Sequence, residues 1–187
     1  MENALAAAIA AIARGDETID LYRKGITDAG AAALAIAVGN STSLKALDLR
    51  GNQITDVGAT ALALALKEST SLENLSLSDN QITDACVAAL ASIIEKSTSL
   101  QTLGLNSNQI TRASVETLAS AMAKSTSMVK IHLYGNHISD VYMAALDRAF
   151  RVVNAHHALL CVVRLLREDG DHALAWRVAR FLVPCHN

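Results

Sequence analysis

Residues 44–71 read LKALDLRGNQITDVGATALALALKESTS, and this stretch recurs in altered form before and after itself at a spacing of 28 residues. Its frame consists of three leucines, an asparagine and an isoleucine: Leu44, Leu47, Leu49, Asn52 and Ile54. The frame begins again at Leu72, Leu100 and Met128, and an earlier copy begins at Asp16. Copies that keep one register predict a chain built from repeated structural units.

Each copy has two halves with different periodicities. The L-x-L part alternates apolar and polar residues, which predicts a short, half-buried strand. A Thr-Asp or Ser-Asp pair then precedes a run rich in alanine and leucine, and we expect this pair to cap the start of a helix. Each predicted helix ends at a Ser-Thr-Ser turn: residues 41–43, 69–71, 97–99 and 125–127.

The predicted helices have an apolar face. In the copy that begins at Leu44, we expect this face to contain five residues: Val57, Ala61, Leu62, Ala65 and Leu66. We expect Ile36 and Leu64 to pack against the adjacent helix rather than to face solvent.

The frame is the signature of leucine-rich repeats. No unit of this size can bury its leucines alone, so neighbouring units must stack. We therefore predict an α/β leucine-rich repeat solenoid, a shallow right-handed horseshoe with parallel strands on its concave side and helices on its convex side. The frame asparagines are expected to satisfy backbone groups where each strand bends away: Asn52, Asn80, Asn108 and Asn136.

The two ends differ from the repeats. Residues 1–15 predict an N-terminal cap helix, because Glu2 stands where a signal peptide would begin with a basic residue. Residues 16–155 contain five 28-residue repeats. For residues 156–187 two interpretations stay open: a degenerate sixth repeat, or a helical cap with helices at 157–168 and Asp171–Val183.

Composition and charge exclude several classes of function. The 187-residue chain has a net charge of −2 and an aromatic content of 3%, with both charge signs spread along it. A nucleic-acid-binding protein would show a basic stripe and a membrane span a longer apolar run, so we expect neither partner. Three irregularly spaced cysteines argue against a disulfide framework and for the reducing cytoplasm. We expect a monomer.

No motif for metal binding or catalysis is convincing. The histidines and cysteines between His156 and His186 are of types that bind zinc, but their spacing is not that of a zinc finger. The sequence has no phosphate-cradling glycine loop, and a shallow solenoid offers no cleft for a pair of catalytic carboxylates. We therefore expect no metal, no cofactor and no catalytic activity.

The 28-residue unit with N-x-I-T-D, a small residue and a full helix resembles the ribonuclease-inhibitor-type leucine-rich repeats. Such repeats also occur in NOD-like receptors and in the Ran GTPase-activating protein. The resemblance covers residues 16–155 and implies a non-catalytic module that binds a protein partner on its concave face. The alternative, in a different functional class, is a regulator of a small GTPase that resembles the Ran GTPase-activating protein.

The variable residues around L-x-L form the predicted concave face. In-register strands place them in columns whose neighbours are about 4.8 Å apart. Tyrosine and arginine are enriched among the residues that dominate protein interfaces. The candidate partner-binding residues are Tyr22, Asp48, Arg50, Asn106, His132 and Tyr134. The competing interpretation is a solvated polar surface without a partner.

Overall fold

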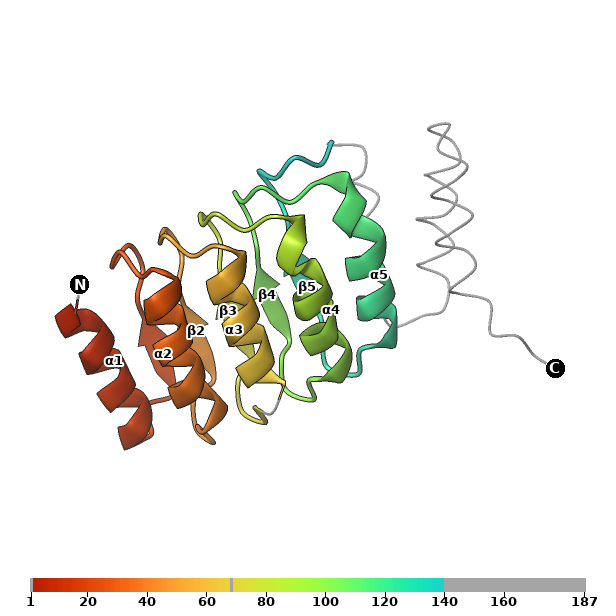
Figure 1. Cartoon of the computed structure of the whole chain (residues 1–187). Helices are drawn as coiled ribbons and strands as arrows, with labels where there is room; N and C mark the ends of the chain where they lie inside the picture. The colour runs from red at the N-terminus through yellow and green to blue at the C-terminus, as the bar shows by residue number, and fades with distance from the viewer. Residues whose placement is uncertain (1, 68, 140–187) are drawn as a thin grey trace, which may run out of the picture.

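Short strands and helices alternate along the chain in the computed structural model, which describes residues 2–67 and 69–139 (Figure 1). The elements in chain order are α1 (Glu2–Arg14), β1 (Thr18–Asp20), α2 (Asp28–Gly39), β2 (Ala46–Asp48), α3 (Asp56–Leu66), β3 (Asn74–Ser76), η1 (Asp84–Cys86), α4 (Val87–Lys96), β4 (Thr102–Gly104), η2 (Arg112–Ser114), α5 (Val115–Lys124) and β5 (Lys130–His132). The end of the fifth repeat and the unit predicted for residues 156–187 lie outside the described residues.

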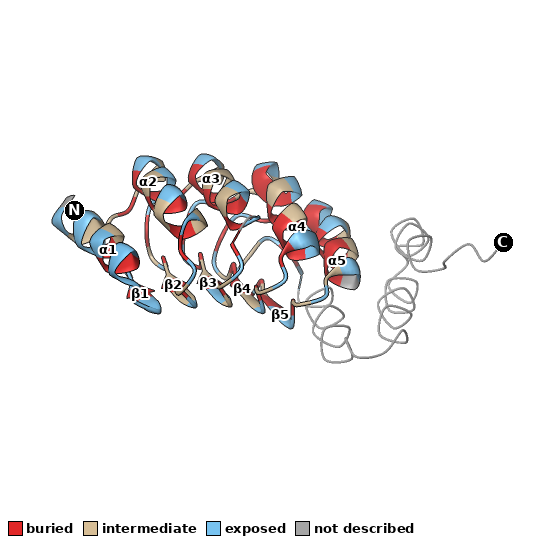
Figure 2. Cartoon of the chain, turned by 90° about the horizontal axis from the view of Figure 1, so that it is seen from below, coloured by how far each residue is buried: buried red, intermediate tan, exposed pale blue. Residues whose placement is uncertain are grey.

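The strands form one parallel sheet in the order β1-β2-β3-β4-β5. Each strand residue pairs with the residue at the same place in the next copy, as Leu47 does with Leu75 and Leu75 with Leu103. The strands lie along one side of the stack and the helices along the other (Figure 2). These features confirm the predicted solenoid, with the sequence period setting the strand register.

The core lies between the sheet and the helices. The middle residue of each strand points into it, and these residues are all buried: Ile19, Leu47, Leu75, Leu103 and Ile131. Leu49, Ile54 and Leu62 of the second copy are also fully buried, so strand, bend and helix each contribute to the same layer. Because both flanks of an inner unit are covered by its neighbours, burial depends on stacking.

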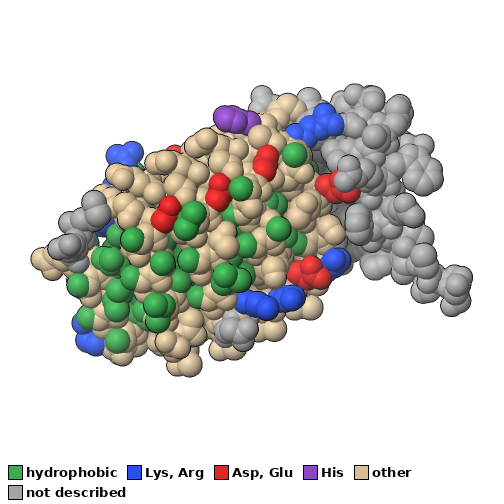
Figure 3. All heavy atoms as spheres, viewed as in Figure 1, with side chains coloured by type: hydrophobic (Ala, Val, Ile, Leu, Met, Phe, Trp, Pro, Cys, Tyr) green, Lys and Arg blue, Asp and Glu red, His purple; other side chains and the backbone are tan. Residues whose placement is uncertain are grey.

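The helical face differs from the prediction. In α3 the buried residues are Gly58, Ala59, Leu62, Ala63 and Leu66. Val57 is 70% exposed, so its assignment to the apolar face was wrong. Ile36 and Leu64 are 71% and 65% exposed, so the expectation that they pack against the adjacent helix was also wrong. Each helix contacts the sheet with one side and its neighbours with its flanks, which leaves an outer side in solvent. Hydrophobic side chains gather there over α1–α3 (Figure 3).

The buried asparagines connect successive repeats, as predicted. The Nδ2 of Asn80 donates to the carbonyl oxygens of Leu49 and Leu77, both at 3.0 Å. Its Oδ1 accepts the backbone N–H of Ile54 at 3.0 Å. Asn52 and Asn108 repeat this pattern one copy earlier and one copy later. The amides therefore satisfy buried backbone groups in two units at once.

Three aspartates form a second connection between repeats, which we call the carboxylate ladder: Asp28, Asp56 and Asp84. Thr55 caps its own helix by accepting the N–H of Val57, as predicted. Asp28, however, accepts the backbone N–H of Thr55 at 2.8 Å, its hydroxyl at 2.7 Å and the N–H of Gly58 at 3.0 Å. The carboxylate thus caps the helix of the following repeat, and the expectation that it caps its own helix was wrong.

The hydrogen bonds of the ladder control the ionisation of its carboxyl groups. Burial by itself raises the pKa of Asp28, but hydrogen bonds from Thr55 and Gly58 outweigh burial and hold the pKa below its usual value. The pKa values of Asp56 and Asp84 are lowered in the same way. A negative charge at the start of the next helix is also favoured by the helix dipole.

The residue that faces each carboxylate must be small. A Cβ on Gly58 would lie 2.6 Å from Oδ1 of Asp28 and 2.9 Å from Cγ2 of Ile54, so a larger residue there would displace the carboxylate or the isoleucine. Cys86 and Ser114 hold this place in the next two repeats, and there the helix begins with the 3-10 turns η1 and η2.

Among the helices of the described residues, none is long and apolar enough to cross a membrane.

Candidate functional site

A shallow groove runs along the concave face and is lined by residues of all five strands. Strand pairing places residues 20, 48, 76, 104 and 132 in one continuous column. The column that starts at Tyr22 follows directly after the strands. The backbone N–H of Arg23 donates to the carbonyl of Arg50 at 3.0 Å, and that of Ser107 to the carbonyl of Tyr134 at 2.7 Å. The two columns are therefore neighbouring ladders, as the sequence predicted.

The middle of the groove has a floor of very small side chains, Ser76, Ser78 and Gly104. A Cβ on Gly104 would lie 2.9 Å from Oγ of Ser76 and 3.2 Å from Oγ of Ser78. Ser78 is buried, and its hydroxyl accepts the backbone N–H of Asn106 at 3.1 Å. The floor is therefore low and nearly flat, and a partner can approach the backbone of β3 and β4 there.

The N-terminal end of the groove combines charge with an aromatic ring. The Nε of Arg50 donates to both carboxylate oxygens of Asp48 at 2.9 Å, and the Nη2 donates to Oδ2 at 2.5 Å. The guanidinium carbon of Arg50 also lies 5.4 Å from the centroid of the Tyr22 ring. Burial raises the pKa of Asp48, but the hydrogen bonds and charge of Arg50 outweigh burial and lower it. The structure thus brings Tyr22, Asp48 and Arg50 together.

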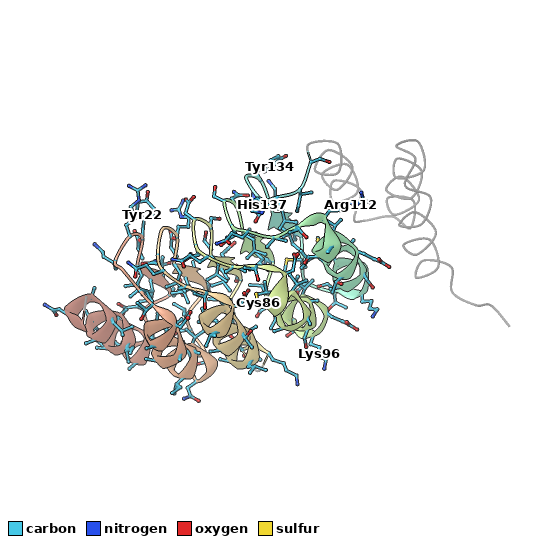
Figure 4. All side chains as sticks on the ribbon, turned by 45° about the horizontal axis from the view of Figure 1, so that its top comes forward. Tyr22, Cys86, Lys96, Arg112, Tyr134 and His137 are labelled. Carbon is cyan, nitrogen blue, oxygen red and sulfur yellow. The ribbon has the colours of Figure 1, made fainter. Side chains whose placement is uncertain are left out.

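The C-terminal end contains the other three predicted residues. Tyr134 is 50% exposed, whereas Asn106 and His132 are half-buried. The Oδ1 of Asn106 accepts the backbone N–H of Tyr134 at 2.9 Å, so this amide oxygen already has a structural partner. Tyr22 and Tyr134 hold equivalent places four strands apart, which corresponds to about 19 Å. Both lie on the loop side of the stack (Figure 4).

Sequence reasoning missed two cations beside Tyr22. Arg23 also lies over the Tyr22 ring, with its guanidinium carbon 5.1 Å from the ring centroid. Lys24 follows it and is exposed. Lys24 occupies the place of the frame asparagine in the first copy. The run Tyr-Arg-Lys directly after a strand was the signal that could have identified both.

The described residues contain no group of three or more histidine, cysteine or acidic side chains that could hold a metal. Cys86 is buried, and burial together with the nearby Asp56 raises the pKa of its thiol to about 12. A nucleophilic cysteine needs a thiolate at neutral pH, so this thiol has a structural role.

Comparison with known proteins identifies the repeat. The family model described as "Leucine Rich repeat" matches residues 40–63, 68–91 and 96–119. These matches and the parallel sheet agree on the fold, a leucine-rich repeat solenoid. A search of curated proteins finds no matching sequence.

The comparison with solved structures supports the same fold through a match with a TM-score above 0.5. Leiomodin-1 actin-binding site 2 is 16% identical, with a TM-score of 0.64 over 93% of this chain and 94% of that one. The tropomodulin C-terminal domain of Caenorhabditis elegans is also 16% identical, with a TM-score of 0.45 over 95% and 90% of the two chains. An internalin of Listeria monocytogenes is 23% identical, with a TM-score of 0.34 over 59% and 39%.

Proposed function

We propose that this leucine-rich repeat protein is a non-catalytic interaction module that binds a protein partner on its concave face. The observation that supports the proposal is the shape of that face, a floor of Ser76, Ser78 and Gly104 between ends that carry Tyr22 and Tyr134. A helix is about 10–12 Å across with its side chains, and it fits between two tyrosines about 19 Å apart. Tyrosine, arginine and histidine at the two ends supply side chains typical of interface anchors.

The 28-residue period and the N-x-I-T-D motif further support assignment to the ribonuclease-inhibitor-type class of repeats. Proteins of that class bind their partners on the strand side of the solenoid. This assignment agrees with the proposed site, since the side-chain type in the exposed columns of the strands varies from copy to copy.

Affinity capture with three forms of the protein tests the proposal. The first is the wild type, and the second carries Tyr22→Ala, Arg50→Ala and Tyr134→Ala on the concave face. The third is a matched control with three exposed substitutions on the helical side: Ile36→Ser, Val57→Ser and Leu64→Ser. Circular dichroism spectra and urea midpoints establish that all three forms are folded.

We expect a protein that the wild type and the convex variant retain and the concave variant loses. Loss from the convex variant alone would contradict a concave site. A small GTPase among the retained proteins would favour the regulatory alternative, which a GTP hydrolysis assay then measures directly. Purified actin is a further arm of the test, because leiomodin-1 actin-binding site 2 has the same fold.

A further inference from the structure

Four residues at the N-terminal end of the groove form what we call the cationic corner: Tyr22, Arg23, Lys24 and Arg50. Two carboxylates lie close to it. Asp48 is paired with Arg50, and Oδ1 of Asp20 accepts the backbone N–H of Tyr22 at 2.8 Å. Among residues 2–67 and 69–139, however, no carboxylate forms an ion pair with Arg23 or Lys24. The corner therefore presents two exposed cations whose charge no ion pair compensates.

The backbone holds Arg23 in an unfavourable conformation. Its φ is +53°, in the left-handed region that non-glycine residues seldom adopt. The equivalent residues of the other four copies share this region: Gly51, Asp79, Ser107 and Gly135 have φ values of +68°, +55°, +51° and +71°. The bend of each repeat therefore imposes this conformation, and Arg23 differs from its equivalents in carrying a long, charged side chain there.

Gly51 makes the space in which the corner is assembled. A Cβ there would lie 2.7 Å from Cγ of Arg23 and 3.4 Å from Cε2 of Tyr22. The equivalent residues of the next two repeats are Asp79 and Ser107, whose side chains would occupy that space. Gly135 leaves a similar space beside Ser107, but the stem of a long side chain, that of Arg23, lies against the glycine at Gly51.

Donor groups of the corner remain available to a partner. Arg50 uses its Nε and Nη2 to bind Asp48, which fixes the orientation of its guanidinium group. Its Nη1 and the guanidinium of Arg23 make no hydrogen bond within the described part of the chain. The planar fork of an oriented guanidinium matches the geometry of a carboxylate.

We propose that the cationic corner binds an acidic segment of the partner protein, one that carries adjacent aspartate or glutamate side chains. The inference rests on the proposed function, because it places this segment at one end of the partner that lies along the groove. Carboxylates of the segment accept hydrogen bonds from Arg23 and Arg50, and Lys24 adds a third positive charge. Tyr22 contributes an apolar surface beside these charges.

A peptide titration tests the inference without knowledge of the partner. Fluorescein-labelled octaglutamate is titrated with the protein at low ionic strength and followed by anisotropy, with octalysine and octaglutamine as comparison peptides. We expect octaglutamate to bind more tightly than both, and its affinity to fall as salt screens the exposed charges. Absence of octaglutamate binding, or equal binding of octalysine, overturns the inference.

Charge-matched variants separate the corner from the net charge of the protein. Arg23→Glu with Lys24→Glu should weaken octaglutamate binding about tenfold, since two exposed ion pairs become two repulsions. Lys67→Glu with Lys96→Glu makes the same change in net charge at the ends of α3 and α4 and should weaken binding less than about twofold. Equal losses in the two double variants overturn the inference.

Two glycine variants test the assembly of the corner. Gly51→Ala keeps every charge but displaces Arg23, and it should weaken octaglutamate binding about threefold because the orientation of the donors is lost. Gly135→Ala imposes a similar backbone cost at the other end of the groove and should leave peptide binding unchanged. Equal affinities of the Gly51→Ala variant and the wild type overturn the inference.

The two proposals can fail separately. If the concave variant loses a captured protein while the wild type shows no preference for octaglutamate, the proposed function stands and the acidic segment is excluded. If octaglutamate binds at the corner while no protein is lost from the concave variant, the corner stands as a carboxylate site and the interaction proposal fails.

Discussion

Removing the amide of Asn80 should destabilise the solenoid strongly although no apolar contact in the core is lost. In an Asn80→Ala variant, the carbonyls of Leu49 and Leu77 lose a donor, the N–H of Ile54 loses its acceptor, and a longer bond of 3.2 Å to the carbonyl of Ser78 is also lost. The three shorter hydrogen bonds at about 1 kcal/mol each, with about 1 kcal/mol more for a buried N–H left unpaired, give a loss of about 4 kcal/mol. Domains of this size are stable by only about 5–15 kcal/mol, so the effect is large.

Urea unfolding followed by far-ultraviolet circular dichroism measures this loss. The matched control is Gln81→Ala, because Gln81 is exposed and contributes only its backbone N–H to the connection, at 2.9 Å from the carbonyl of Ile54. The control should change the free energy of unfolding by less than about 0.5 kcal/mol. If the Asn80→Ala variant lies within about 1 kcal/mol of the control, the asparagines do not carry the connection between repeats and the reasoning is refuted.

Three further predictions concern the core, the carboxylate ladder and the buried thiol. Leu75→Ala, at a fully buried strand position, should cost about 2–5 kcal/mol, whereas Leu64→Ala on the exposed side should cost less than about 0.5 kcal/mol, and urea unfolding of both compares them. The carboxyl groups of the carboxylate ladder have lower pKa values in the folded state than in the unfolded state. Their contribution to the free energy of unfolding is therefore complete above about pH 4, near the pKa of the unfolded state, and is lost as the pH falls through the pKa values of the folded state. A urea midpoint that decreases less on acidification after Asp56→Asn than in the wild type supports this, and identical acid profiles contradict it. The thiol of Cys86, with a pKa of about 12 and no exposure, should resist iodoacetamide in the native protein and react in urea, and peptide mapping by mass spectrometry distinguishes it from the other cysteines.

The sequence was sufficient to predict the register of the strands, because the frame residues all face the core. Leu47 alternates with its neighbours, faces the core in every copy, and pairs with its equivalent in the next strand. A period of 28 residues and an alternation of two leave one consistent pairing. Asn80 was predictable for a similar reason, since a polar residue at the bend of a buried unit needs backbone partners.

Residues whose partner lies in another copy were harder to predict. Asp28 stands at a helix start, where an acidic residue normally caps its own helix, and nothing in its local sequence shows that Thr55 is closer. Ile36 and Leu64 follow an apolar helical pattern, but that pattern gives no information on which side of a helix a solenoid leaves in solvent.

The candidate site shows the same limit. Tyr22 and Tyr134 could be placed in one column by counting, because the column follows from the period. The side chain of Arg50 folds back onto Asp48, and that of Arg23 lies against Gly51. Both arrangements depend on side-chain rotamers, which the sequence does not give. Residue type alone therefore identified the ends of the groove but did not identify which cations remain unpaired there.

The amide connection has a direction, and this direction matters while the chain is being synthesised. The N–H of Ile54 finds its acceptor in Asn80, 26 residues later in the chain. A repeat that has left the ribosome therefore remains incomplete until the first nine residues of the following repeat, 72–80 in this case, have been translated. Closure of each repeat thus waits for the start of the next one, and a premature stop codon leaves the last unit without the amide that would have closed it. Loss of residues from the other end has no such consequence, because an amide left without its earlier partner still binds the carbonyls of its own repeat.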